Sequence, residues 1–173
     1  LQVLRTARDV FHCLNVARIG SDDLRVVSCN MRRLYGAIDK LLAMRFDVRL
    51  LQATDVENRL VPELRRRASA AGRFLEFGAA TQLDVNGSLG RRVAILSRHP
   101  LVDVAPHADS DKTLAYLNSS GRWIEKAITV GEEGDRSVVL SLLYCVSGSP
   151  SDCQKRAVTQ RLHSAAFARA HAF

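Results

Sequence analysis

The chain has 173 residues, of which 47% are hydrophobic, so it can bury one core and nothing in its length demands a second domain. Its 25 Lys and Arg outnumber its 18 Asp and Glu, and the resulting charge of +7 suits a polyanionic partner. No apolar run reaches the roughly 18 residues that cross a bilayer, and the N-terminus lacks the apolar centre of a signal peptide. We therefore expect an intracellular protein with no membrane partner, located in the nucleus if its partner is DNA.

Arginine supplies most of the positive charge and is densest at residues 65–67 and 91–92. Such a run is either a solvated helix face or a nucleic-acid contact, and both interpretations stay open. Cysteines and histidines show no zinc-ligand spacing and no CxxC pair, which favours reduced, structural thiols. The four cysteines are Cys13, Cys29, Cys145 and Cys153.

The first elements in chain order are an extension, a strand and a helix. Residues 1–23 are expected to be an N-terminal extension, with a helix over 3–16 because apolar residues recur on one helical face. Apolar and β-branched residues predict a strand over 24–30. The next apolar residues recur at helical spacing over 34–42, which predicts an amphipathic helix.

After residue 47 the pattern of strand and helix repeats, with a strand over 48–52 and a helix from Pro62 to Gly72. A final helix, with an apolar stripe over 158–166, follows a loop. Between these helices lie three more predicted strands, the last two joined by a turn at 131–135: 92–97, 123–130 and 138–146. Strands that alternate with helices early and pair later predict an α/β (α+β) fold, a mixed sheet flanked by helices.

Several strand ends carry polar residues, beginning with Asn30, although an asparagine there alone more often starts a turn. The ordered segments together resemble the endonuclease/exonuclease/phosphatase (DNase I-like) superfamily. The first strand closes on Asn30, and the second reads Leu-Gln-Ala-Thr, with Ala53 where the family has a metal-binding glutamate. The third resembles the family's Gly-Val-Ala-Ile-Leu strand, with Arg92 in place of the glycine. The last two resemble the family's successive strands near Arg122 and Tyr144.

The resemblance covers residues 24–173 and implies the N-terminal half of a DNase I-like four-layer sandwich, a partial domain. The segment from Tyr144 onward is similar to endonuclease domains of non-LTR retrotransposons. The family's later Gly-Asp-Phe-Asn strand and Ser-Asp-His segment, which supplies the general base, have no counterpart in the sequence. We therefore expect a degenerate, truncated member of the family.

The resemblance implies an ancestral activity, hydrolysis of DNA phosphodiesters with Mg²⁺ or Mn²⁺ as cofactor. It places Asn30 at the metal and Gln52 in the cleft. Ala53 has no oxygen to offer, so metal binding is doubtful. Asp55 replaces the glutamate as a metal ligand if the strand continues, because residues two apart share a face; otherwise it is a solvated residue at the strand end.

Two further residues match family positions. Tyr144 matches the active-site tyrosine, a catalytic residue, and the alternative is a tyrosine packed in the core. Arg122 matches an arginine that contacts backbone phosphate, and the alternative is a surface arginine.

Two functions follow from these residues. The chain is either a nuclease relative that has lost its activity, or a non-catalytic, retroelement-derived fragment that binds nucleic acid through its basic surface. Half a sandwich exposes an apolar sheet face, so a homodimer is also expected.

Overall fold

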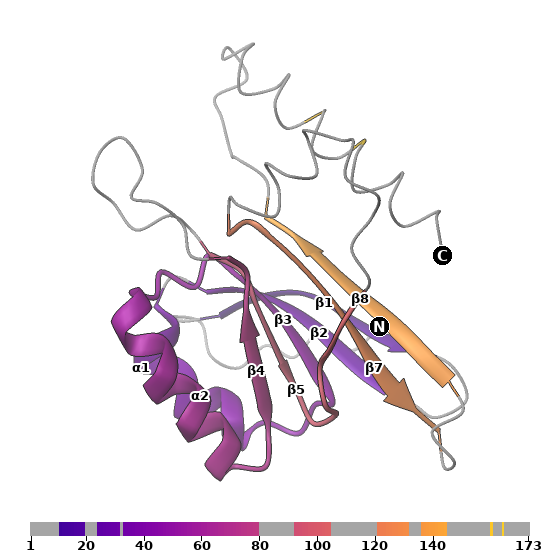
Figure 1. Ribbon diagram of the computed structural model, residues 1–173, viewed down its shortest axis with the longest axis horizontal. Coiled ribbons are helices and arrows are strands. Elements are labelled where there is room, and N and C mark those ends of the chain that lie inside the picture. The colour runs from indigo at the N-terminus through magenta and orange to yellow at the C-terminus, as the bar shows by residue number, and fades with distance from the viewer. Residues whose placement is uncertain are drawn as a thin grey trace.

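The computed structural model describes residues 11–19, 24–31, 33–79, 92–104, 121–131 and 136–144, together with Gln160 and Ser164; for 11–19 it describes the backbone. These residues form a five-stranded sheet, a three-stranded sheet and two α-helices (Figure 1). From β2 to α2 the order of the elements follows the alternation of strand and helix that the sequence predicts.

The five-stranded sheet has the order β1-β2-β3-β5-β4. Its β2 and β3 run parallel, and every other neighbouring pair is antiparallel, so the sheet is mixed. A parallel pair needs a crossover, which the helix between β2 and β3 supplies. The strands are β1 (Phe11–Ile19), β2 (Leu24–Met31), β3 (Val48–Gln52), β4 (Phe74–Phe77) and β5 (Ala94–Ser97).

Two helices cover one face of this sheet, α1 (Leu34–Ala43) and α2 (Val61–Ala70) (Figure 1). A short 3₁₀ turn, η1 (Asn58–Leu60), leads into α2, which has Pro62 in its first turn. Apolar residues at helical spacing along α1 and α2 pack onto one face of the strands, because only one stripe of each helix is apolar. The buried residues of this helix-side core include Ile38, Leu41, Leu64, Leu51, Leu75 and Leu96.

The second sheet has the order β6-β7-β8 and is antiparallel throughout. It consists of β6 (Val102–Asp103), β7 (Trp123–Val130) and β8 (Arg136–Leu143). Its inward side chains pack against the face of the first sheet that the helices leave uncovered. This inter-sheet core includes Val26, Val48, Ile95, Ile128, Leu140 and Leu142. The described residues therefore form three layers: helices, sheet and sheet.

The two sheets meet backbone to backbone at one end, beside Gly78. The Gly78 amide donates to the Val93 carbonyl at 2.9 Å, and the Val93 amide donates to the Gly121 carbonyl at 2.9 Å. A Cβ atom at Gly78 would lie 2.8 Å from the Gly121 oxygen and 2.9 Å from the Trp123 oxygen. Only glycine fits this approach, since those backbone oxygens cannot easily move aside.

Most expected elements in the described residues are confirmed: β2, β3, β5, β7, β8 and both helices lie where the sequence predicts them. The helix expected over 3–16 is wrong for residues 11–16, which are extended in β1 and pair with β2. The boundary after residue 23 stays a prediction, since one paired strand does not define a domain. Two short strands, β4 and β6, have no counterpart among the elements that the sequence predicts.

Other expectations fall outside the described residues, including the final helix, of which only the helical residues Gln160 and Ser164 are described. Of the four cysteines, Cys29 has a described side chain, which is buried; the reduced state of the thiols stays a prediction. Neither α1 nor α2, the α-helices with described bounds, is long and apolar enough to cross a membrane.

Candidate functional site

Asn30 and Gln52 lie side by side where two parallel strands end. They are register partners in the pairing of β2 with β3. Side chains alternate across a strand, so Asn30 is on the same face as Val26, and Gln52 on the same face as Val48. Val26 and Val48 belong to the inter-sheet core. Both amide side chains are therefore at the end of the face that looks toward the second sheet.

Backbone hydrogen bonds bring the later strands to the same end. The Thr54 amide donates to the Arg92 carbonyl at 2.9 Å, just before β5 begins. The Tyr144 amide donates to the Arg122 carbonyl at 2.8 Å, just before β7 and after β8. Together with the bond from Val93 to Gly121, these contacts join the ends of β3, β5, β7 and β8.

Arg122 and Tyr144 share the inter-sheet side with the two amides. Arg122 is two residues before Ile124, which belongs to the inter-sheet core, so both lie on the same face of the sheet. Tyr144 packs against the same core. The guanidinium carbon of Arg122 lies 5.6 Å from the centroid of the Tyr144 ring, which is within the range of a cation–π contact. We call Asn30, Gln52, Arg122 and Tyr144 the inter-sheet edge. The sequence named all four residues, and the fold brings them to one end.

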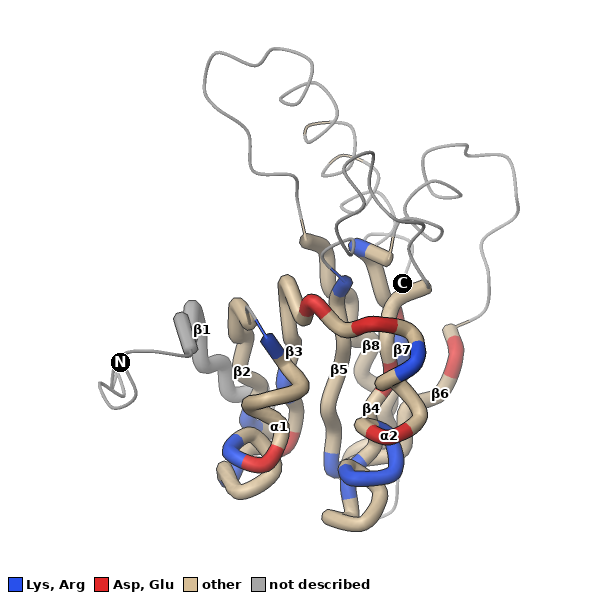
Figure 2. The backbone as a smooth tube through the Cα atoms, turned by 90° about the vertical axis from the view of Figure 1, so that its left-hand side faces the viewer, with Lys and Arg blue, Asp and Glu red and all other residues tan. Residues whose placement is uncertain are grey.

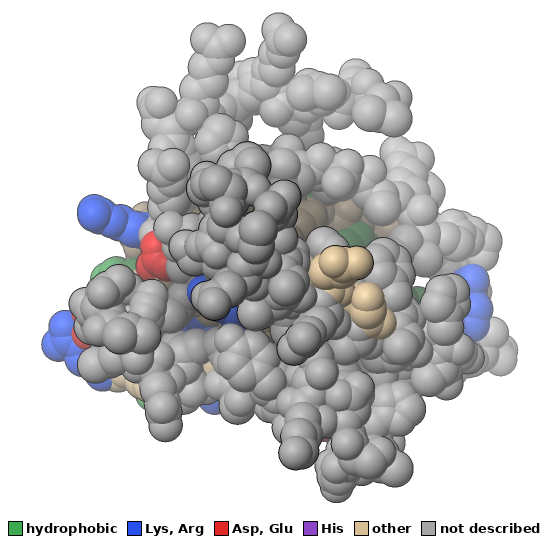
Figure 3. All heavy atoms as spheres, turned by 90° about the horizontal axis from the view of Figure 1, so that it is seen from above, with side chains coloured by type: hydrophobic (Ala, Val, Ile, Leu, Met, Phe, Trp, Pro, Cys, Tyr) green, Lys and Arg blue, Asp and Glu red, His purple; other side chains and the backbone are tan. Residues whose placement is uncertain are grey.

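The chemistry of the inter-sheet edge suits an anion. All four side chains are half-buried, and all can donate hydrogen bonds: two amides, one guanidinium and one phenol. An arginine and neutral donors at the same end of the sheets suit the oxygens of a phosphate group. Figure 3 views the molecule onto this end, where Lys and Arg side chains of the described residues are visible at both margins and also nearer the middle.

Ala53 and Asp55 do not continue the strand. β3 ends at Gln52, and Ala53 and Asp55 have φ angles of 51° and 46°, in the left-handed region. Ala53 is buried and Asp55 is exposed. The strand alternation that would align Asp55 with the missing glutamate therefore does not apply, and its role as a metal ligand stays a prediction.

The residues present do not fit Mg²⁺ or Mn²⁺. Hard cations prefer carboxylate oxygens, and the inter-sheet edge offers amide and phenol oxygens instead. No group of three or more His, Cys, Asp or Glu in the described part of the chain could hold a metal ion. The family resemblance implies a metal-binding glutamate at position 53, and this chain has Ala53 there.

Arg92, where the family strand has glycine, is buried on the helix side of the edge. Its Nε donates to the Gly78 carbonyl at 2.8 Å, and its terminal nitrogen donates to Asn58 Oδ1 at 2.9 Å. The guanidinium also lies over the Phe77 ring at 5.3 Å. Burial, and then the charge of Arg65, lower the pKa of Arg92.

Arg92 thus fastens η1 and the end of β4 behind the inter-sheet edge. Thr54 adds a second link, since its hydroxyl donates to the Arg92 carbonyl at 3.0 Å. The sequence did not predict this role of Arg92. The one indication was that arginine stands where the resembled strand has glycine.

Comparisons with known proteins bear on the fold. No protein-family model and no curated protein matches the chain. The structure is similar to that of an AP endonuclease from Archaeoglobus fulgidus, with a TM-score of 0.56 and 23% sequence identity. The match covers 80% of this chain and 49% of that one, so the chain spans about half the length of the solved structure. Likeness at this identity concerns the fold alone: the chain has the α/β architecture of the DNase I-like sandwich, as its sequence predicts.

Proposed function

We propose that the chain is a relative of DNase I-like nucleases that binds DNA phosphates at the inter-sheet edge without hydrolysing them. One observation carries the proposal: Asn30, Gln52, Arg122 and Tyr144 lie at one end of the sandwich, and all of them are hydrogen-bond donors. The net charge of +7 supports a polyanionic partner.

We expect no hydrolysis because the residues of the inter-sheet edge offer no carboxylate to a catalytic cation. Hydrolysis of a phosphodiester by this family requires a cation held by carboxylates and a base that activates water. Ala53 cannot ligate a cation, and Asp55 is exposed in the loop beyond β3. The inter-sheet edge therefore retains groups that bind phosphate and lacks groups that would activate an attack on it.

Binding is tested with Arg122→Gln, which removes one charge and keeps a polar side chain. Fluorescence anisotropy with a labelled duplex of arbitrary sequence should show about 3- to 10-fold weaker binding, and the slope of log K against log salt should fall by about 1. Arg66→Gln is the matched control, because Arg66 is exposed on α2 and carries the same charge. Equal losses in both variants would refute a specific role for the edge.

Inactivity is tested with supercoiled plasmid in the presence of Mg²⁺ or Mn²⁺. The purified protein should produce no nicking above the rate in buffer. Metal-dependent nicking that disappears in Asn30→Ala would overturn this part of the proposal and assign a residual phosphodiesterase activity to the site.

A second candidate is favoured by the arginine excess: a retroelement-derived fragment that binds nucleic acid through its basic surface alone. It predicts salt-sensitive binding that is indifferent to Arg122. The retrotransposon origin is tested in the genome, by translating the sequence that adjoins the codon for residue 173. A Gly-Asp-x-Asn strand followed by an Asp-His pair there would restore most of the catalytic set, although not the glutamate that Ala53 replaces.

A further inference from the structure

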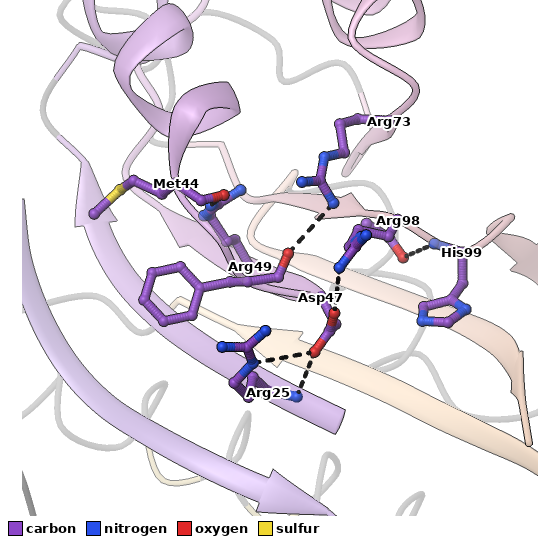
Figure 4. Close-up of polar contacts among 9 residues, drawn as sticks. Arg25, Met44, Asp47, Arg49, Arg73, Arg98 and His99 are labelled. Atoms are coloured by element: carbon purple, nitrogen blue, oxygen red, sulfur yellow. Dashed lines mark hydrogen bonds and ion pairs between the residues drawn. The ribbon is translucent and has the colours of Figure 1, made fainter. Parts of the chain in front are cut away.

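The opposite end of the five-stranded sheet carries a compact group of arginines around one carboxylate. β2 and β3 begin at this end, and β5 finishes there. Asp47 Oδ2 accepts a hydrogen bond from the Arg25 backbone amide at 2.9 Å and lies 3.7 Å from its Nε. Asp47 Oδ1 accepts one from Arg98 at 3.3 Å. Figure 4 shows both guanidinium groups directed at this single carboxylate.

A third arginine joins the group, and no acidic residue in the described part of the chain pairs with it. Arg73 donates to the Phe46 carbonyl at 3.3 Å. Its pKa is lowered, first by burial and then by the charge of Arg98, which outweigh the opposing effect of Asp47. We call Arg25, Arg73 and Arg98 the basal arginine cluster. Within the described residues, Asp47 is the one carboxylate in contact with the cluster, so these four residues together carry three positive charges and one negative charge.

Backbone hydrogen bonds join the segments that carry the cluster. The Arg98 amide donates to the Asp47 carbonyl at 2.8 Å, and the Asp47 amide donates to the Arg25 carbonyl at 3.1 Å. Beneath them the buried Arg49 donates to the Met44 carbonyl at 2.6 Å and lies over the Phe46 ring. Hydrogen bonds from several segments therefore hold Asp47 and the arginines around it in place.

The cations are accessible and the carboxylate is recessed. The Arg25 and Arg98 side chains are 42% and 53% exposed, whereas the Asp47 side chain is 15% exposed. Figure 2 shows basic residues at this end of the sheet, interspersed with acidic ones. An anion approaching from solvent meets guanidinium groups first.

We propose that the basal arginine cluster is a second contact surface for nucleic acid, which binds the phosphodiester backbone without reading its sequence. Guanidinium groups pair with phosphate oxygens in a bidentate manner, and phosphate contacts of this kind supply sequence-independent affinity. The inference rests on the nucleic-acid binding proposed above, but it uses residues at the other end of β3. The two surfaces can therefore succeed or fail separately.

The test measures the affinity of the full chain for a labelled duplex of arbitrary sequence, by anisotropy at about 50 and 200 mM salt. Arg98→Gln and Arg73→Gln should each weaken binding about 3- to 10-fold and lower the salt slope by about 1. Arg66→Gln, with the same loss of charge on α2, is the comparator for a change in net charge alone, and each cluster variant should lose more affinity than it does. Losses no larger than that of Arg66→Gln would overturn the proposal.

Asp47→Asn should increase the affinity for the duplex, a result that loss of the fold would not produce. Removing the carboxylate raises the charge of the cluster by one, so binding should tighten about 2- to 5-fold at low salt. Thermal unfolding of each variant establishes that the protein measured is folded. A folded Asp47→Asn protein with unchanged or weaker binding would count against the proposal.

Two comparisons separate the basal arginine cluster from the inter-sheet edge and from a lipid-binding surface. If Arg122→Gln weakens binding and the cluster variants do not, binding at the inter-sheet edge is supported and the cluster proposal fails. If only the cluster variants weaken binding, the proposed role of the inter-sheet edge fails. Vesicles with about 30% anionic phospholipid test the other polyanion that suits an arginine surface. Binding to vesicles but not to duplex, lost in Arg98→Gln, would overturn nucleic acid as the partner.

Discussion

Ala53 and Asp55 have left-handed backbones directly after the strand that carries Gln52. Their φ angles of 51° and 46° are costly for residues with a Cβ atom. Ala53 is also buried, and it is the residue that aligns with a glutamate in the resemblance noted from the sequence. The bend thus separates β3 from the loop that follows it.

Ala53→Gly is expected to stabilise the protein by about 0.5–1 kcal/mol. Glycine removes about 1–2 kcal/mol of left-handed strain and adds about 0.4–1 kcal/mol of entropy to the unfolded chain. The free energy of unfolding in urea measures the difference. Ala43→Gly, at the exposed end of α1, should be neutral or destabilising; a loss of stability in Ala53→Gly as well would contradict the presence of strain at Ala53.

Asp47 is expected to make stability depend on pH. Burial pushes its pKa upward, but hydrogen bonds from the Arg25 amide and the Arg98 side chain, with the charges of both arginines, hold the pKa below its ordinary value. A carboxyl with a depressed folded pKa stabilises the fold above its unfolded pKa, about 3.9, and loses that contribution as the pH falls through the folded pKa.

Urea unfolding of the wild type and Asp47→Asn from pH 7 to pH 3 measures this contribution. The wild type should be the more stable protein at pH 7, and its advantage should shrink below about pH 4. An advantage that is constant over the whole range would mean that the charge of Asp47 does not contribute.

At the scale of elements, prediction succeeded where periodicity and length agreed. β2, α1 and β3 follow one another with clean strand and helix patterns, and β3 was predicted to the residue. β1 was missed because its apolar residues also fit one face of a helix, and pairing with β2 decided the conformation. β4 was also missed: its four residues include the charged Glu76, whereas the four residues of β5 continue an apolar run, and β4 pairs with β5.

The approach of the two sheets at Gly78 gives a prediction for the packing of elements. Gly78→Ala should lower stability by about 1–3 kcal/mol, because its Cβ would lie 2.8 Å from the Gly121 oxygen, a backbone atom. Gly36→Ala is the matched control, since a Cβ there has nothing within 4 Å and alanine favours the interior of α1. It should stabilise by about 1 kcal/mol. Similar effects of the two changes would contradict the close approach of the sheets.

At the scale of the whole molecule, the sequence predicted the fold class and named the four residues of the inter-sheet edge. It did not predict the basal arginine cluster, because Asp47 contacts residues that are 22 and 51 positions away along the chain. No local pattern reports such pairs. The role of Arg92 was hidden for the same reason: Asn58, its side-chain partner, lies 34 positions away.

The homodimer stays a prediction of the sequence. Among the described residues the large exposed apolar side chains are Tyr35, Phe74 and Val102, which lie on three different elements. The outward face of β7 and β8 includes a hydrogen bond from Ser141 to Glu125 at 3.0 Å. Sedimentation velocity over a tenfold range of concentration tests the prediction. A coefficient that rises with concentration supports a dimer, and a constant monomer value contradicts it.

The strand order has a consequence for synthesis on the ribosome. β5 lies between β3 and β4, although both precede it in the chain. Until residue 97 has left the exit tunnel, β3 lacks its neighbour on one side and β4 has no strand to pair with. A nascent chain that pauses after α2 therefore presents open strand edges, which are templates for association with other chains. We expect protection of this intermediate, by a chaperone or by rapid translation of residues 78–97, to raise the yield of folded protein.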